Sequence, residues 1–472
     1  MTMRRALLGI ISILFAVAAG VCLTLGGKFL SDYKADHREL DKDVRLSDEQ
    51  VFDEEYNSFY GIDRFETDLP VIFITTEEFI QKDIPTVGRI SVLNAGSDGK
   101  LHAVSEKPDV TFDATFKIRG ASSFHFEKSQ YRVKLLADAE SGTEVKYDLL
   151  GMGRESEWVL NGPFLDRTLA RNYVAYHLAG EIMEWAPECR YVELFLNGQY
   201  RGVYLAVEPI TNGEGRLRLS TFGFLSGETA YIISRDRIGS DTDPLQNYGT
   251  ITGLTPLSLY VEYPGKKNIT DREYAWIESD ISNFEKALFG PDFADPDKGY
   301  AKYIDVDNFV GYFILNEMFM NHDGDTLSTY AYKELGGKLK LCVWDFNNSV
   351  DNYQWFKEDY DIFYLTDGSW FSRLLKDRNF VDRIVTRYQE LRRTTLSTEH
   401  MLGLIDAAGA ELGDAVTRNF QVWGYTFDIN LLVSSGRDLR DYEAAVTQFK
   451  EGLKRRGEFL DAHITDLYEG CE

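Results

Sequence analysis

Alternating and continuous runs of apolar residues predict β-strands through the first half of the chain. Residues 111–119 alternate clearly between apolar and polar positions, as in a half-buried strand. Asn197-Gly198 separates two further runs and strongly favours a two-residue β-turn, so residues 191–207 predict a hairpin. The other expected strands cover residues 69–74, 89–94, 131–136 and 339–344.

Apolar residues at three- and four-residue spacing predict helices, half of them within the last third of the chain. Asp166 is a typical N-cap residue and predicts a helix over 167–183. Residues 213–260 are rich in Gly and Asp and predict an irregular insertion or a small sheet. Because mostly strands precede mostly helices, the expected fold class is α+β, with a strand-rich N-terminal half and a helix-rich C-terminal third. The other expected helices cover residues 271–288, 305–320, 374–393, 398–420 and 441–468.

The N-terminal sequence predicts a segment that directs the protein to a membrane. Residues 1–5 are basic, and the residues after them are uncharged as far as Leu25. A helix of about 20 such residues is long enough to cross a bilayer. We therefore expect residues 6–27 to form one transmembrane helix with the domain outside the cytoplasm. A signal peptide cleaved near residues 16–18 is the alternative, which would make the protein a secreted or spore-coat protein.

A single domain is expected after this segment. Residues 28–68 are charged and weakly patterned, and they predict a tether or a short exposed helix. The domain then covers residues 69–465. The pattern divides it into a strand-rich lobe (69–212), the insertion (213–265) and a helical lobe (266–465).

Charge and cysteine content exclude several classes of function. The net charge of −25 should repel nucleic acids and anionic membrane surfaces, so no nucleic-acid partner is expected. A phosphate-binding site in such a chain should stand out as a local cluster of basic residues. The 4 Cys include no C-x-x-C pair, so neither a zinc site nor a disulfide framework is indicated.

A glycine-containing loop between two predicted strands is a candidate for such a cluster. Gly120 and the small residues after it allow backbone N–H groups to approach a phosphate, and the flanking strands add positive charge. An ordinary hairpin with solvated basic residues is the alternative. Neither G-x-x-x-x-G-K-[ST] nor G-x-G-x-x-G occurs. The candidate phosphate-binding residues are Arg119, Ser122, Ser123, Lys128 and Lys134.

Two aspartates next to apolar segments are candidates for phosphoryl-transfer chemistry. Asp345 follows a buried strand, where a carboxylate is costly unless it is paired or holds a cation. With Asn347 it offers hard oxygen ligands to Mg²⁺, while Asp323 could orient a hydroxyl nucleophile. Glu208 closes another apolar strand and could bind a sugar hydroxyl, although an exposed strand-end glutamate is the alternative.

Other interpretations of the acidic residues remain open. Asp323 and Asp345 could simply cap turns. A pair of acidic residues also suits a glycoside hydrolase, but that chemistry has no use for the basic loop. A serine hydrolase has little support, because no G-x-S-x-G is present.

Five ordered motifs resemble the CotH-like kinases, a family named for a bacterial spore coat protein. The similarity runs from about Leu69 to about His463. The loop resembles the family's R-G-N-S-S, with Ala121 in place of Asn, and W-D-x-D is matched except for Asn347 in place of the second Asp. The matching segments are residues 119–123, 160–172, 197–208, 316–323 and 344–347.

The resemblance implies an atypical protein-kinase-like fold that binds ATP in the strand-rich lobe, with Mg²⁺ or Mn²⁺ at an acidic site in the helical lobe. It implies phosphate transfer to Ser or Thr of envelope or coat proteins. By motif, Asp323 would be the catalytic aspartate and Asp345 the metal ligand, Glu208 would lie near the nucleotide hinge, and Lys134 or Lys128 would contact phosphate. Because Ala121 and Asn347 depart from the family pattern, a non-catalytic surface or spore-coat scaffold is the alternative.

Overall fold

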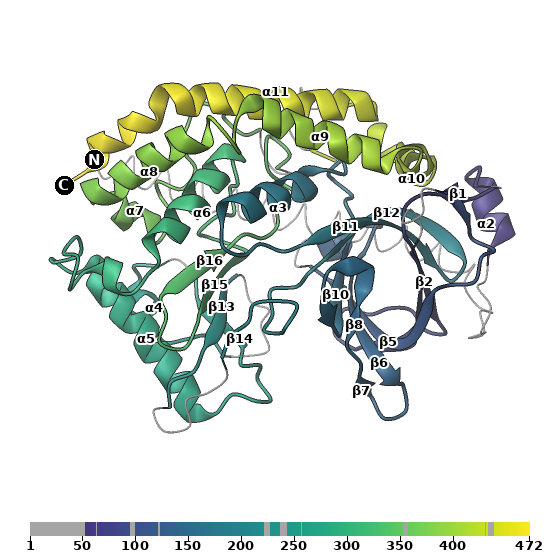
Figure 1. Cartoon of the computed structure of the whole chain (residues 1–472), viewed down its shortest axis with the longest axis horizontal. Coiled ribbons are helices and arrows are strands. Elements are labelled where there is room, and N and C mark those ends of the chain that lie inside the picture. Colours follow the sequence, from purple (N-terminus) through teal and green to yellow (C-terminus); the bar gives the residue numbers. More distant parts are fainter. Residues whose placement is uncertain are drawn as a thin grey trace, which may run out of the picture.

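The computed structural model describes residues 52–62, 64–94, 100–120, 123–220, 227–236, 243–255, 257–353, 357–429, 431–432 and 439–472. The expected transmembrane helix (6–27) and most of the expected tether lie outside these ranges. Within them, no helix is both long and apolar enough to cross a membrane. As expected, the fold is mixed, with strands in the first half and most helices in the C-terminal part (Figure 1).

A closed β-barrel forms the first half of the fold. Its strands are β2 Val71–Thr76, β3 Thr86–Leu93, β5 Val110–Arg119, β6 Gln130–Asp138, β10 Glu157–Asn161, β11 Cys189–Leu196 and β12 Gln199–Val207. They follow the order β10-β12-β11-β2-β3-β5-β6, and β6 pairs with β10 to close the ring. β11 and β2 run parallel, and the other neighbours are antiparallel. The barrel interior is apolar and includes Ile72, Phe116 and Trp158.

The expected strands of this half are confirmed, with ends that differ by a few residues. The hairpin is also confirmed, since β11 and β12 pair in antiparallel register on either side of Asn197-Gly198. Shorter strands decorate the barrel: β1 Glu66–Thr67, β4 His102–Ala103, β7 Thr143–Glu144, β8 Tyr147–Asp148 and β9 Arg154–Glu155. The 3-10 turns in this half are η2 Ser123–His125 and η3 Leu149–Gly151.

Part of the expected tether packs against the barrel. Helix α2 (Glu54–Phe59) begins at the N-cap Asp53, whose carboxylate accepts the Tyr56 N–H at 2.9 Å. Asn57 is buried, donates to the Gly198 carbonyl at 2.8 Å and accepts the Tyr200 N–H at 2.9 Å. The short helix was expected, but its position against β12 was not.

A four-stranded antiparallel sheet forms the centre of the second half. It consists of β13 Tyr231–Arg235, β14 Leu259–Tyr263, β15 Thr329–Lys333 and β16 Leu339–Cys342, in the order β14-β13-β15-β16. The segment 213–265, expected to be an insertion, therefore supplies two strands of this sheet. Because β13 pairs with β15, the expected boundary at residue 265 divides the strands of a single sheet.

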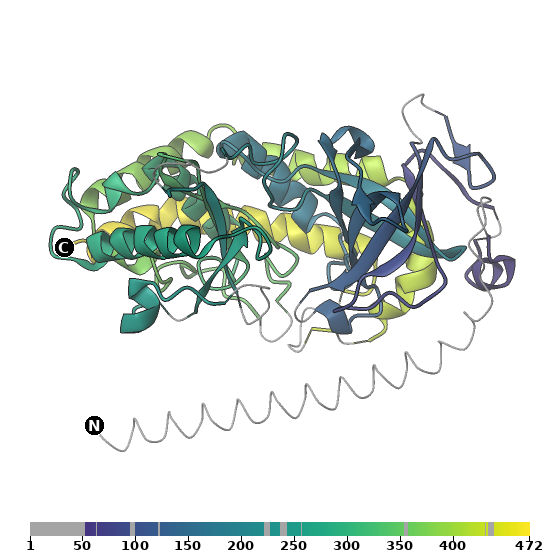
Figure 2. The ribbon, with the colours of Figure 1, turned by 90° about the horizontal axis from the view of Figure 1, so that it is seen from below.

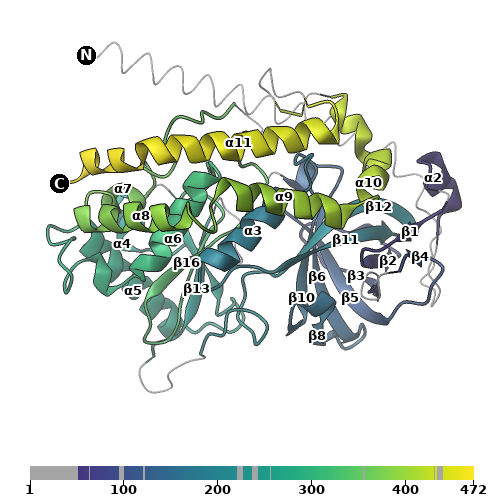
Figure 3. The ribbon, with the colours of Figure 1, turned by 45° about the horizontal axis from the view of Figure 1, so that its top comes forward.

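Helices cover this sheet and extend toward the barrel. They are α3 Arg171–Ile182, α4 Tyr248–Thr252, α5 Asp271–Phe289, α6 Val306–Met318, α7 Phe371–Leu374, α8 Arg378–Leu391, α9 Thr398–Leu412, α10 Ala415–Trp423 and α11 Tyr442–His463. The 3-10 turns are η4 Tyr300–Lys302, η5 Gly424–Phe427 and η6 Ile464–Gly470. Figure 2 shows the barrel and the second sheet side by side, and Figure 3 shows α11 running along α9 above α3.

Local capping explains where the helices differ from the sequence prediction. The segment expected as one helix over 374–393 is divided at Asp377, which caps α8 by accepting the Asn379 N–H at 2.9 Å. The segment over 398–420 is divided at Gly413, the C-cap of α9. Helix α3 starts at Arg171 rather than near 167, because the Asp166 carboxylate accepts the N–H groups of Thr168 and Arg171 across a turn.

Buried ion pairs connect the helices to distant segments. Glu317 at the end of α6 pairs with Arg456 of α11 at 2.6 Å and also accepts the backbone N–H groups of Tyr364 and Leu365. Asp325 pairs with Arg235 of β13 at 2.7 Å, and both side chains are fully buried. Removing one partner of such a pair leaves an uncompensated buried charge, which typically costs about 3–5 kcal/mol.

Candidate functional site

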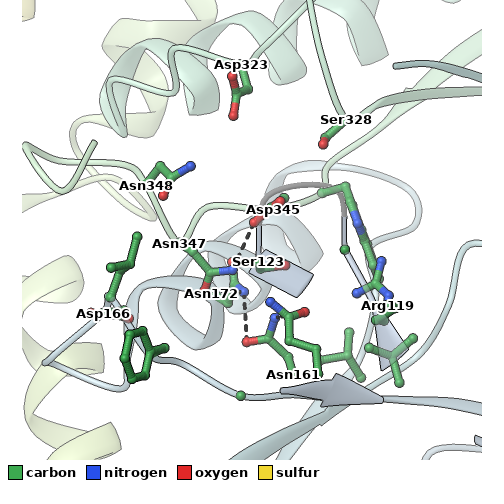
Figure 4. Close-up of a pocket in the computed structure, with 18 of the residues that line it drawn as sticks. Arg119, Ser123, Asn161, Asp166, Asn172, Asp323, Ser328, Asp345, Asn347 and Asn348 are labelled. Atoms are coloured by element: carbon green, nitrogen blue, oxygen red, sulfur yellow. Dashed lines mark hydrogen bonds between the residues drawn. The ribbon is translucent and has the colours of Figure 1, made fainter. Parts of the chain in front are cut away.

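A polar pocket lies where the barrel meets the second sheet, and all of the expected acidic residues except Glu208 reach it (Figure 4). The end of β5 contributes Arg119 and the end of β10 contributes Asn161. The loop before β15 contributes Asp323, and the segment after β16 contributes Asp345 and Asn347. Two carboxylates from separate parts of the chain therefore face one cleft.

The loop after β5 forms one wall of the pocket. Arg119, Gly120 and Ser123 line it, while Ser122 lies outside the residues that the structure describes. Gly120 has φ +105°, and a Cβ there would lie 2.0 Å from the Ser123 Oγ. The conformation therefore requires glycine, as the sequence suggested. The Arg119 guanidinium lies 5.1 Å from the Trp344 ring centroid, so a cation–π contact holds it beside Asp345.

The two loops that carry the aspartates have unusual backbone conformations. Six of the nine non-glycine residues with positive φ in the described structure lie in these loops: Met320, Asp325, Ser328, Asp345, Val350 and Asp351. Such conformations cost free energy and occur often at functional sites. Asp325 anchors the first loop, because its carboxylate accepts the Trp370 N–H at 2.9 Å as well as pairing with Arg235.

Asp345 lies deep in the molecule and is reached by solvent through the pocket. Its backbone N–H donates to the Tyr176 hydroxyl at 3.3 Å, and its Oδ1 accepts the Asn347 Nδ2–H at 2.9 Å. Burial raises the pKa of this carboxyl, while Arg119 and the hydrogen bonds from Asn347 act in the opposite direction. A bound cation would compensate the desolvated charge.

Four side-chain amides connect Asp345 to the barrel. Asn172 of α3 accepts the Phe346 N–H at 2.7 Å and donates to Asn347 Oδ1 at 3.0 Å. Asn172 also lies 3.4 Å from Asn161 Oδ1, and Asn161 donates to Gln130 Oε1 at 3.0 Å. The chain of hydrogen bonds thus runs from β6 and β10 through α3 to the segment after β16.

The charge of the pocket differs from what the sequence led us to expect. Among the described residues that line it, Arg119 is the only Lys or Arg, whereas four are aspartates: Asp166, Asp236, Asp323 and Asp345. Arg171 pairs with Asp166 at 2.6 Å. The expected basic cluster is therefore absent from the described lining, and a polyphosphate would need cations to bind here.

Neither candidate lysine lines the pocket. Lys128 is buried behind it, donates to Asn419 Oδ1 at 2.7 Å and lies 5.3 Å from the Tyr204 ring centroid. Burial holds the pKa of Lys128 well below its usual value. Lys134 lies on the outer face of β6 and pairs with Glu144 at 2.9 Å. These environments suit structural roles rather than phosphate binding, so the structure does not support either lysine as a phosphate ligand.

Glu208 is also engaged elsewhere. Its carboxylate pairs with Arg216 at 2.6 Å and accepts the Glu188 N–H at 2.9 Å, and it is buried rather than exposed at the strand end. Val207, the residue before it, lines the pocket, whereas Glu208 does not. Burial raises the pKa of Glu208 to about 7. The expected sugar-binding role is therefore not supported by its position.

Sequence reasoning overlooked several residues of the pocket. Asp236 follows the apolar strand β13 and could have been found by the argument applied to Asp345. Asn172 was part of a matched motif but had no assigned role. Asn161 was likewise part of a matched motif without an assigned role, whereas Gln130 and Tyr176 carry no local signal, because their positions in the pocket depend on pairing between distant segments.

The pocket suits a cation that is bound together with a phosphate ligand. The described residues include no group of three or more His, Cys, Asp or Glu side chains that could hold a metal ion. The oxygen donors of the lining include the carboxylates of Asp323 and Asp345 and the Asn348 side chain. Mg²⁺ is commonly held by one or two carboxylates, with phosphate oxygens and water completing its coordination, so these residues fit such an ion.

Comparison with known proteins agrees with the resemblance of the motifs. No curated protein matches the chain. The model of the family described as CotH kinase protein matches residues 116–460, which include every described residue expected at the site. This match extends over most of the chain, from β5 to α11, and the protein therefore belongs to the CotH kinase protein family.

Proposed function

We propose that this protein is a metal-dependent phosphotransferase with an atypical protein-kinase-like fold. It would transfer the γ-phosphate of ATP to Ser or Thr of envelope or coat proteins outside the cytoplasm, anchored through residues 6–27. The observation that carries the proposal is the presence of Asp323 and Asp345, from separate loops, in one pocket beside Arg119. Membership of the CotH kinase protein family supports the same class of activity.

Each of these residues has a distinct role in the proposed reaction. Asp323 would orient the acceptor hydroxyl and accept its proton, and Asp345 would hold Mg²⁺ or Mn²⁺. Arg119 and the backbone of the loop after β5 would bind phosphate oxygens. When bound, the cation supplies shielding of phosphate charge, which is needed here because the pocket lining is acidic.

The proposal is tested by incubating residues 52–472 with γ-labelled ATP, Mn²⁺ and a cell-envelope extract. We expect label in protein with the parent, and a loss of more than about 100-fold with Asp345→Asn or Asp323→Asn. Asp297→Asn is the matched control, because Asp297 is exposed and outside the pocket. Equal labelling by the parent and Asp345→Asn would refute the role of Asp345.

A non-catalytic scaffold is the second candidate function. Two observations favour it: the Asn347 amide rather than a carboxylate faces Asp345, and Arg119 is the only Lys or Arg in the described lining. A scaffold that retains the pocket would show a thermal shift with ATP and no transfer of label. Detection of labelled protein that depends on Asp345 would exclude it.

A further inference from the structure

The orientation of Asn347 follows from one backbone donor. The Phe346 N–H can only donate, and it lies 2.7 Å from a terminal atom of the Asn172 amide, which must therefore be oxygen. The other terminal atom of Asn172 is then its NH₂ group, 3.0 Å from a terminal atom of Asn347. That atom of Asn347 must accept, so it is also oxygen.

This assignment leaves the NH₂ group of Asn347 facing Asp345. Nδ2 of Asn347 lies 2.9 Å from Asp345 Oδ1, a hydrogen bond to a carboxylate. The assignment is consistent along the rest of the chain, because Asn161 presents its oxygen to Asn172 and its NH₂ to Gln130. Turning the Asn347 amide over would place two NH₂ groups together and an oxygen against the carboxylate.

The backbone of this segment is also held in place. Asn352 Nδ2 donates to the Asn347 carbonyl at 2.7 Å, and Ser349 donates both its N–H and its hydroxyl to the Phe346 carbonyl. A shift of this backbone therefore does not bring Oδ1 of Asn347 to the place that Nδ2 occupies beside Asp345.

We propose that Asn172 fixes Asn347 as a hydrogen-bond donor to Asp345, so that Asn347 positions the metal-binding carboxylate and is not itself a metal ligand. The proposal replaces the expected role of Asn347 as a ligand, and it deepens the proposed function, on whose metal site it rests. Asp345 then provides the only ligand from the segment 345–347, and one of its oxygens is shared with an amide donor.

The first test locates the Asn347 amide in the absence of metal. A neutron structure of the deuterated, EDTA-treated protein should place the Asn347 amide deuterons toward Asp345 and those of Asn172 toward Asn347. An Asn347 oxygen facing Asp345 would overturn the proposal. The neutron structure decides the orientation of the Asn347 amide whether or not the protein binds metal. A wild-type protein without metal affinity would refute the proposed function, while the amide orientation would still be decided by the neutron structure.

The second test measures Mn²⁺ binding, without nucleotide, by calorimetry. Asn347→Ala should weaken Mn²⁺ binding by less than about fivefold, because a donor that positions Asp345 is lost but no ligand is lost; weakening by more than about fivefold would identify a ligand and overturn the proposal. Asn347→Asp should tighten binding by about tenfold or more, since a second carboxylate joins Asp345. Asn379→Ala, on α8 and outside the pocket, controls for the loss of an amide.

A double-mutant cycle separates positioning from general support of the fold. Asn172→Ala releases Asn347 and should change the Mn²⁺ affinity in the wild-type background. The effect should be smaller in the Asn347→Ala background, because the part that passes through Asn347 is already lost and only the hydrogen bond from the Phe346 N–H to Asn172 remains to be removed. Equal effects in both backgrounds, or none in either, would show that Asn172 does not position Asn347.

Discussion

Aspartates two residues apart in the loop before β15 have opposite environments. Asp323 lines the pocket, whereas Asp325 is fully buried and bonded to Arg235 and to the Trp370 N–H. Asp323 was a candidate from the sequence and Asp325 was not, although both lie in one short loop. At the residue scale, function therefore depends on partners that are distant along the chain.

Substitution of these two aspartates should separate stability from activity. Asp325→Asn leaves the buried Arg235 without its counter-charge and should lower the free energy of unfolding by about 3 kcal/mol or more. Asp323→Asn should change it by less than about 0.5 kcal/mol while abolishing transfer. Urea unfolding of both variants measures the difference. Similar destabilisation by both would contradict the division of roles.

Glu208 should make stability depend on pH. Its pKa is raised from 4.5 to about 7 by burial, so the folded state binds this proton more tightly than the unfolded state. The contribution of Glu208 to stability is complete below about pH 4.5 and is lost as the pH rises through 7.

Comparison with Glu208→Gln isolates this effect. Between pH 5 and pH 8 the wild type should lose on the order of 1–3 kcal/mol relative to the variant, whose side chain does not ionise. Denaturant unfolding across this range provides the measurement. Parallel pH profiles would show that Arg216 fully compensates the Glu208 charge in the fold.

At the scale of elements, the contact between α10 and β12 depends on one glycine. Gly202 has φ +88°, and a Cβ there would lie 2.5 Å from Asn419 Oδ1. That oxygen accepts both the Lys128 Nζ–H and the Val203 N–H, so it has little freedom to move. Gly202, which lies in the matching segment 197–208, thus permits α10 to approach the barrel.

Gly202→Ala should therefore destabilise the protein by about 1–3 kcal/mol, through both backbone strain and the contact with Asn419. Gly403→Ala is the matched control. It lies on the exposed face of α9 with no atom near the added Cβ, and alanine there should stabilise by up to about 1 kcal/mol. Thermal unfolding of the two variants should show shifts of opposite sign, and equal shifts would contradict this explanation.

The elements themselves could largely be predicted from the sequence. Alternation over β5 and the Asn-Gly turn between β11 and β12 are local signals, and the structure confirms them. Helix breaks at Asp377 and Gly413 were missed because helical periodicity continues across them. The pairing of β13 with β15 joins segments nearly a hundred residues apart, and no local pattern encodes it.

Part of the candidate site could likewise be predicted from local sequence signals, and the part that depends on long-range pairing could not. Asp323 and Asp345 were proposed because they lie next to apolar segments, and Arg119 because it precedes the glycine of a loop with basic flanks; all three line the pocket. Lys134 and Glu208 lie outside the pocket lining and pair instead with Glu144 and Arg216, which are 10 and 8 residues further along the chain. Which face of a strand meets the pocket depends on the closure of the barrel.

At the scale of the whole molecule, the charge makes nucleotide binding depend on metal. The chain carries a net charge of −25, and four aspartates line the pocket against one described arginine. Without cations, ATP should be repelled from this site.

Removal of divalent ions should therefore abolish the thermal stabilisation by ATP. In the presence of Mn²⁺, ATP at about 100 times its Kd should stabilise the fold by about 2.7 kcal/mol, and EDTA should eliminate this gain. Differential scanning fluorimetry with ATP, with Mn²⁺ and with both provides the comparison. Equal stabilisation by ATP in EDTA would show that the aspartates do not control binding.

The ion pair between Glu317 and Arg456 has a consequence for biosynthesis. Glu317 lies at the end of α6, next to the loop that carries Asp323, and its guanidinium partner comes from the last long helix of the chain. Because 139 positions separate the two residues, a ribosome must make all the sequence from α6 to α11 before this buried carboxylate can be neutralised. Until then the Glu317 carboxylate at the end of α6 has no Arg456 to pair with. Premature stop codons upstream of α11 should therefore yield products that quality-control proteases degrade.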